Sequence, residues 1–190
     1  TQDEINVRDE ALSRIEDRVS RVPILLSWSQ YSGQAPALLM GTDERMPAMV
    51  NALDTMGIAG LGTFSHGEEY QVYVGEDRIL LCGNDLRALR WGLMSLIELM
   101  AETGGTMYVD RAYLRDWPDF PQRVMTINSP IRNQEQADMV NQIADLGYSG
   151  KMNEVEWNEP DLGRNCSPFV LSHSLEVRDK LLQRGLALTM

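Results

Sequence analysis

The segment Asp116–Pro121 (DWPDFP) divides the chain into two parts whose hydrophobic residues follow different patterns. Pro118 and Pro121 lack backbone N–H donors and fix φ, so neither a helix nor a central strand can continue through this segment. The part before this segment is predicted to begin with an amphipathic helix, which is followed by a strand, a strand, a helix, a hairpin, a helix and a strand. After it, the order is strand–helix–strand–helix–strand. We therefore predict two domains, residues 1–121 and residues 122–190.

The first domain is expected to have an α+β fold, a small mixed or antiparallel sheet covered by two helices on one face. Its clearest pattern is a β-hairpin, because apolar residues alternate on both sides of Gly75-Glu76-Asp77. The expected elements are a helix at 1–20 with Ile5, Leu12, Ile15 and Val19 on one stripe, a strand at 21–31, a buried strand at 37–40, a helix from Pro47 to Gly57, hairpin strands at 70–74 and 79–82, a helix capped by Asn84 or Asp85 and closed by Gly104-Gly105, and an extended segment at 107–114.

The second domain is expected to be an incomplete (β/α) barrel segment with parallel strands. Its expected elements are strands at 123–128, 152–157 and 186–190, a helix from Gln134 to Leu146 ended by Gly147, and a helix from Leu175 to Gln183. A closed (β/α)8 barrel needs ~250 residues, so we expect this chain to be the N-terminal part of a longer protein. The alternative is a compact two-layer domain whose last strand pairs back into the first sheet.

Composition excludes several classes of function. The chain has 17 Lys+Arg and 28 Asp+Glu, a net charge of −11, so it lacks the positive potential that nucleic-acid binding requires. No apolar run approaches the ~18–20 residues that span a bilayer. Two cysteines, Cys82 and Cys166, make neither a disulfide framework nor a zinc site. His66 and His173 are expected on loops and lack ligand spacing, so we expect neither a metal nor a cofactor.

The string Arg115–Arg123 is the most specific motif in the chain. It resembles the D-x-P-x-F-x-x-R junction of family 20 glycoside hydrolases, the β-N-acetylhexosaminidases, which joins a small α+β domain to the first strand of a catalytic (β/α)8 barrel. The hairpin and following helix, Tyr70–Leu93, look like that small domain, and Lys151-Met152-Asn153 before Trp157 is similar to the K-x-N-x-x-x-W pattern of the second barrel strand. The resemblance implies a non-catalytic domain followed by the beginning of a catalytic barrel.

The chain departs from the family pattern at several positions. Glu156 and Asn158 flank Trp157 where the family has histidines, Val124 and Asn128 replace a Gly and an Asp, and the substrate-binding Arg is shifted by one position, to Arg132. These departures leave the N-acetylhexosaminidase specificity open. An α-glucuronidase-like glycosidase and a carbohydrate-binding or scaffold protein without catalysis are the alternatives.

The resemblance also implies a substrate site. Barrel strands end at the catalytic face, so Asn128, Arg132, Glu156 and Asn158 are expected to line the mouth that binds the sugar. On residue type alone, Arg132 also fits a solvated loop and Asn158 a turn. Glu154 shares a strand face with Glu156, so we expect one of them to meet a cation such as Lys151 or Arg132, or to titrate high.

The resemblance leads to an expected function. The family's catalytic acid lies on the fourth strand, beyond Met190, so no catalytic residue is assigned here. We expect the N-terminal portion of an exo-acting, hexosaminidase-like glycoside hydrolase that cleaves a terminal sugar of a glycan and is inactive as this segment alone. The chain begins at Thr1, which together with the resemblance indicates a periplasmic or extracellular enzyme. A small stand-alone α/β regulatory domain is the remaining alternative.

Overall fold

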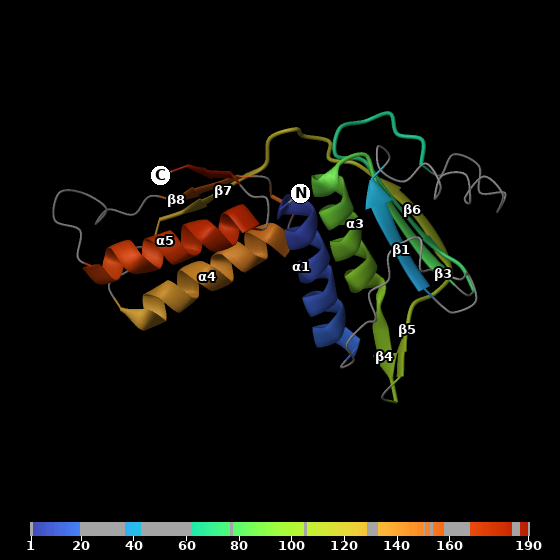
Figure 1. The fold of residues 1–190 in the computed structure, drawn as a ribbon, viewed down its shortest axis with the longest axis horizontal. Helices are drawn as coiled ribbons and strands as arrows, with labels where there is room; N and C mark the ends of the chain where they lie inside the picture. The colour runs from blue at the N-terminus through green and yellow to red at the C-terminus, as the bar shows by residue number, and fades with distance from the viewer. Residues whose placement is uncertain are drawn as a thin grey trace. The chain divides into compact units, whose positions relative to one another are not determined.

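The computed structural model describes residues 2–19, 37–42, 62–76, 78–104, 106–128, 133–149, 151–152, 154–157, 168–183 and 187–189 (Figure 1). The chain forms two compact units, Thr1–Asp119 (unit 1) and Phe120–Met190 (unit 2). The boundary falls within the proline-containing segment that separates the two sequence patterns.

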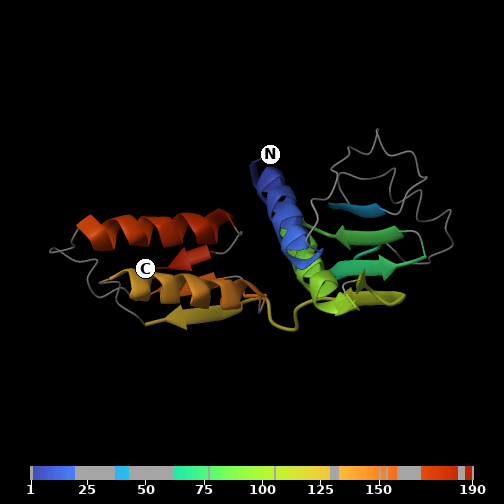
Figure 2. The same cartoon turned by 90° about the horizontal axis from the view of Figure 1, so that it is seen from below.

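Unit 1 is a mixed α+β layer. It contains α1 (Gln2–Val19), β1 (Ala37–Thr42), β2 (Tyr70–Val74), β3 (Arg78–Gly83), α3 (Leu86–Leu99), β4 (Ala101–Thr103), β5 (Thr106–Tyr108) and β6 (Ala112–Asp116). Four strands form a sheet in the order β1-β3-β2-β6, which Figure 2 shows from the side, and β4 pairs with β5 separately. β1 runs parallel to β3, and the other two pairs of this sheet are antiparallel. The predicted α+β fold of this part is confirmed.

The predicted hairpin is β2 and β3, in register from Tyr70↔Gly83 to Val74↔Ile79. Its turn closes with the Gly75 N–H donating to the Arg78 carbonyl at 2.9 Å. β1 is half-buried along its whole length, so the prediction of a buried strand there is correct in type but overstates its burial.

Helix α3 lies on the sheet and begins as predicted. Asp85 is the N-cap, and its Oδ1 accepts a hydrogen bond from the Ala88 N–H at 2.7 Å. α3 lies close to the strands at Gly92, where an added Cβ would lie 2.3 Å from Leu81 Cδ1 and 2.9 Å from Tyr70 Cδ2. The sequence of this helix therefore fits a close contact with β2 and β3.

The predicted end of this helix is wrong. α3 stops at Leu99, because Met100 takes an extended backbone conformation (φ −74°, ψ 127°). Gly104, with φ +60°, instead turns the chain between β4 and β5, and Gly105 lies outside the described residues. The single extended segment predicted at 107–114 is divided into two strands in the structure, β5 and β6.

Helix α1 packs on α3, which separates it from the sheet in Figure 1. Its buried side chains are Val7 and Ala11, whereas Ile5 of the predicted stripe is exposed. The side of α1 that faces α3 also contains a polar contact. The buried Arg90 of α3 faces Glu10, whose carboxylate lies 3.9 Å from the Arg90 Nε. Leu12 and Ile15 of the predicted stripe are half-buried, so the prediction departs from the structure at Ile5. The charged Glu10 also belongs to the inward side of α1, which hydropathy alone does not predict.

Unit 2 consists of β7 (Val124–Ile127), α4 (Gln134–Ser149), β8 (Glu154–Trp157), α5 (Pro168–Gln183) and β9 (Ala187–Thr189). The strands form a parallel sheet in the order β7-β8-β9, which confirms the predicted strand–helix alternation. Because β9 pairs with β8, the alternative in which the last strand joins the first sheet is wrong.

The helices of unit 2 differ from the prediction at their ends. α4 continues past Gly147 to Ser149, and its Leu146, predicted to face inward, is 70% exposed. α5 begins at Pro168, seven positions before the predicted Leu175, because proline suits the first turn of a helix. The predictions for residues 21–31 and for Pro47 to Gly57 lie outside the described residues.

Candidate functional site

Glu156, one of the residues predicted to bind substrate, lies on the face of the unit 2 sheet that the helices leave uncovered. Ile127 and Val155 are buried, while Val124, two strand positions below Thr126, is 40% exposed. Since side chains alternate along a strand, Val124, Thr126, Glu154 and Glu156 share the opposite face from Ile127 and Val155. We call this the helix-free face.

Two of the predicted site residues can be placed. Glu156 is paired in register with Thr126, and its Oε2 accepts a hydrogen bond from the Thr126 hydroxyl at 3.3 Å. Asn128 follows β7 directly and is exposed. Arg132 and Asn158 lie outside the described residues, so the structure brings Glu156 and Asn128 to the ends of adjacent strands and leaves the other two as predictions.

Glu154 and Glu156 do share one face, as the alternation predicts. The Oε2 of Glu154, two residues before Glu156 on β8, accepts a hydrogen bond from the Gln122 amide at 3.3 Å. The Gln122 amide and the Thr126 hydroxyl are neutral donors, and the predicted pairing with Arg132 falls on an undescribed residue.

The charged residues of the junction string have structural partners. Arg123 donates from Nε to the Lys151 carbonyl at 2.7 Å and from Nη1 to the Phe120 carbonyl at 2.8 Å. Asp116 accepts from the Tyr70 hydroxyl at 2.6 Å and from the Trp117 N–H at 2.9 Å. These contacts fix the two ends of the proline-containing segment within their own units.

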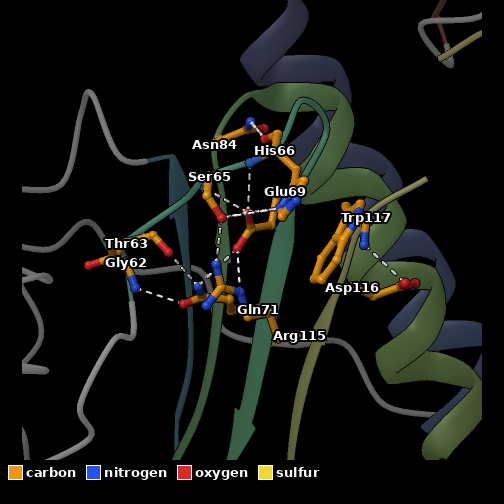
Figure 3. Close-up of polar contacts among 10 residues, drawn as sticks. All are labelled: Gly62, Thr63, Ser65, His66, Glu69, Gln71, Asn84, Arg115, Asp116 and Trp117. Atoms are coloured by element: carbon orange, nitrogen blue, oxygen red, sulfur yellow. Dashed lines mark hydrogen bonds and ion pairs between the residues drawn. The ribbon is translucent and has the colours of Figure 1, made fainter. Parts of the chain in front are cut away.

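A second polar cluster, missed by the sequence analysis, surrounds Glu69 in unit 1 (Figure 3). The Glu69 side chain is fully buried, and its oxygens accept from the Ser65 N–H at 2.7 Å, the His66 N–H at 2.9 Å and the Arg115 Nε at 2.6 Å. The adjacent Gln71 accepts from the Gly62 N–H at 2.7 Å and donates to the Thr63 carbonyl at 2.9 Å. The loop before β2 is thus held by the side chains of Gln71 in β2 and of Glu69, the residue that immediately precedes this strand.

The charge of Glu69 is stabilised in place. Burial by itself raises the pKa of Glu69, but the hydrogen bonds from Ser65, Arg115 and His66 outweigh it and lower this pKa to about 2. The carboxylate is therefore ionised in the folded protein at neutral pH. On the opposite face of β2, burial and the hydrogen bond to Asp116 raise the pKa of the Tyr70 hydroxyl, which also lies 2.7 Å from the Ser95 hydroxyl.

The outer layer of this cluster contains two aromatic rings. The His66 and Trp117 rings stack with centroids 4.0 Å apart and planes within 2°, and the Arg115 guanidinium lies 6.0 Å from the Trp117 ring centroid. The alternation of the hairpin places Glu69 and Gln71 on the face of the strand opposite to Tyr70 and Val72. That face is expected to contact solvent, so no sequence signal indicated that both residues would be buried.

The remaining candidate residues have ordinary surroundings. Cys82 is a buried cysteine in the core. His66 lies on a loop, but His173 lies on α5, so its predicted loop position is wrong. Among the described residues no group of three or more His, Cys, Asp or Glu could hold a metal ion. None of the helices in this part of the chain is long and apolar enough to cross a membrane.

No protein-family model matches the chain, and no curated protein matches its sequence. Solved structures do match. CpGH84D has a TM-score of 0.74 at 12% identity, over 96% of this chain and 31% of that one. The Flavobacterium johnsoniae chitobiase FjGH20 has a TM-score of 0.66 at 17% identity, over 99% of this chain and 29% of that one.

A third similar structure is a complex with a sugar. The Vibrio harveyi GH20 exo-β-N-acetylglucosaminidase, solved in complex with N-acetylglucosamine, has a TM-score of 0.64 at 14% identity, over 96% of this chain and 30% of that one. The chain has a hexosaminidase-like fold. It spans less than a third of the length of each of these three proteins.

Proposed function

We propose that this chain is part of an exo-acting glycoside hydrolase that removes a terminal N-acetylhexosamine from a glycan. The observation that carries the proposal is the match of 99% of this chain to the FjGH20 chitobiase, because it extends over unit 1, unit 2 and the segment between them. In this proposal unit 1 is non-catalytic and unit 2 supplies the first strands and helices of a catalytic (β/α)8 barrel.

The helices of unit 2 support a barrel. His173 Nε2 of α5 and Gln134 Oε1 of α4 lie 3.2 Å apart, so these residues mark the flanks on which the two helices meet. At about 100° per residue, the exposed apolar side chains of both helices project from the other flanks. These are Leu171, Leu175 and Leu182 on α5, and Met139 and Leu146 on α4. Apolar flanks on both outer sides fit a ring in which each helix has two neighbours.

The proposed sugar-binding mouth lies at the carboxyl ends of β7 and β8, where barrel enzymes place their substrate residues. There Glu156 accepts hydrogen bonds from sugar hydroxyls, while Asn128 and Asn158 can both donate and accept. Arg132, which lies between β7 and α4 in the sequence, donates. The catalytic acid and base belong to later strands, so this segment alone is inactive, and we place the enzyme in the periplasm or outside the cell.

The experiment assays the polypeptide of the complete reading frame against an aryl N-acetyl-β-glucosaminide and an aryl uronide. We expect hydrolysis of the first, and a roughly tenfold higher KM in Glu156→Gln, because an anionic acceptor becomes a neutral amide. Glu154→Gln is the matched control: it lies at the first position of β8, away from the mouth, and its KM should stay within about twofold.

Two results would contradict the proposal. Hydrolysis of the uronide alone would favour the α-glucuronidase-like alternative. Absence of any hydrolysis, with the sugar still bound, would favour the carbohydrate-binding alternative.

A further inference from the structure

The buried Glu69 rigidifies exposed side chains of unit 1. Three of its hydrogen-bond donors come from Ser65, His66 and Arg115, and Arg115 Nη2 also donates to the Ser65 hydroxyl at 3.0 Å. Asn84 Nδ2 donates to the His66 carbonyl at 2.6 Å. Side chains that are fixed before a ligand arrives lose less conformational entropy on binding. This arrangement therefore resembles the supporting layer of a binding site.

The supported side chains remain open to solvent. His66 and Arg115 have 43% and 36% of their side chains exposed, and Trp117 is 38% exposed. Because the His66 and Trp117 rings stack in parallel, each ring has one face turned away from the other. Figure 3 shows Ser65, His66, Arg115 and Trp117 around Glu69. We call Ser65, His66, Arg115 and Trp117 the Trp117 surface.

The charge of the Trp117 surface selects a neutral ligand. The Arg115 guanidinium is paired with the Glu69 carboxylate at 2.6 Å, so the two charges offset each other and favour neither an anion nor a cation. Flat aromatic faces bind apolar C–H surfaces, and hydroxyl, imidazole and guanidinium groups bind hydroxyls and amides. A sugar combines both features in one ring.

We propose that the Trp117 surface is a second carbohydrate-binding site, separate from the mouth of unit 2, that binds a neutral oligosaccharide of N-acetylhexosamine units. The choice of sugar rests on the proposed function, whereas the position of the site rests on the contacts around Glu69. Such a site would hold a polymeric glycan on the enzyme independently of the cleavage step.

The test is a calorimetric titration of the 190-residue chain with the β-1,4-linked tetrasaccharide of N-acetylglucosamine. Trp117→Ala should weaken binding at least tenfold, because it removes the ring on which the sugar packs. Tyr108→Ala, which removes another exposed aromatic ring of unit 1, is the matched control and should change Kd by less than twofold. No binding by the unmodified chain, or equal Kd values for Trp117→Ala and the unmodified chain, would overturn the proposal.

A second measurement does not depend on the stability of a variant. In NMR titrations of the unmodified chain, the indole N–H of Trp117 and the imidazole signals of His66 should shift with the same Kd. Shifts confined to residues of unit 2 would overturn the proposal. Binding is measured without turnover, so a full-length protein that hydrolyses nothing would refute the proposed function and leave this result standing.

Discussion

The sheets of the two units are covered in different ways. In unit 1, α3 covers one face, and on the other Leu80 and Cys82 pack against Leu39 and Phe64. In unit 2, α4 and α5 adjoin the outer strands, and Val124 on the helix-free face is exposed. Both faces of the unit 1 sheet are therefore covered from within unit 1, whereas the uncovered face of unit 2 is the surface on which we expect the chemistry.

The largest expected effect tests the tight packing of unit 1. In Gly83→Ala the added Cβ would lie 2.5 Å from the Leu89 nitrogen and 2.8 Å from the Asp85 carbonyl oxygen. Backbone atoms cannot move aside cheaply, so we expect the free energy of unfolding of unit 1 to fall by more than about 3 kcal/mol. Urea unfolding followed by circular dichroism measures it.

Gly67→Ala is the matched control for this substitution. An added Cβ at Gly67 has no atom within 4 Å, so the unfolding free energy should stay within about 0.5 kcal/mol of its original value. Equal losses in both variants would show that α3 is not packed tightly against the end of β3.

The next effect is the pH dependence of unit 1. Glu69 has its pKa lowered from 4.5 to about 2 in the folded protein, so its ionised form stabilises folding at any pH above about 5. That stabilisation is lost as the pH falls from about 5 to about 2, and the free energy of unfolding should decrease by about 3 kcal/mol over this range. Glu69→Gln should remove most of this decrease in urea unfolding at several pH values.

Glu76→Gln is the control for the pH series. Glu76 forms an exposed ion pair with Arg111, and exposed pairs contribute little to stability. Its variant should keep the decrease between pH 5 and pH 2. A Glu69→Gln variant that keeps the full decrease would mean that other carboxylates cause it.

A smaller effect compares the two faces of the unit 2 sheet. Val155→Ala removes a fully buried side chain from the central strand β8 and should lower the free energy of unfolding of unit 2 by about 2 kcal/mol. Val124→Ala, on the helix-free face, should cost less than about 0.5 kcal/mol in this chain. Similar losses at both positions would show that the helix-free face is already covered.

Much of the fold could be predicted from the sequence because the hydrophobic pattern is regular. The hairpin from Tyr70 to Gly83 and the alternating strands and helices of unit 2 follow from period alone. Helix ends were less predictable. α3 stops at Leu99 although apolar residues continue, and α4 passes Gly147, since tertiary contacts decide where a helix ends more than a single glycine does.

The polar cluster of unit 1 could not be predicted. Burial of Glu69 depends on Arg115, which is 46 residues away in the chain and reaches it only because β2 pairs with β6. The inward position of Glu10 on α1 could not be predicted for the same reason, because it depends on Arg90 of α3. Spacing within one element does not reveal a charge supplied by another.

We propose that the helix-free face of unit 2 is the inner face of a barrel. Its most direct test is thiol labelling of Val124→Cys, read by mass spectrometry of the peptide, in this chain and in the polypeptide of the complete reading frame. We predict rapid labelling in this chain, where Val124 is exposed, and strong protection in the longer protein. Equal labelling rates in the two proteins would show that the helix-free face is not enclosed in a barrel.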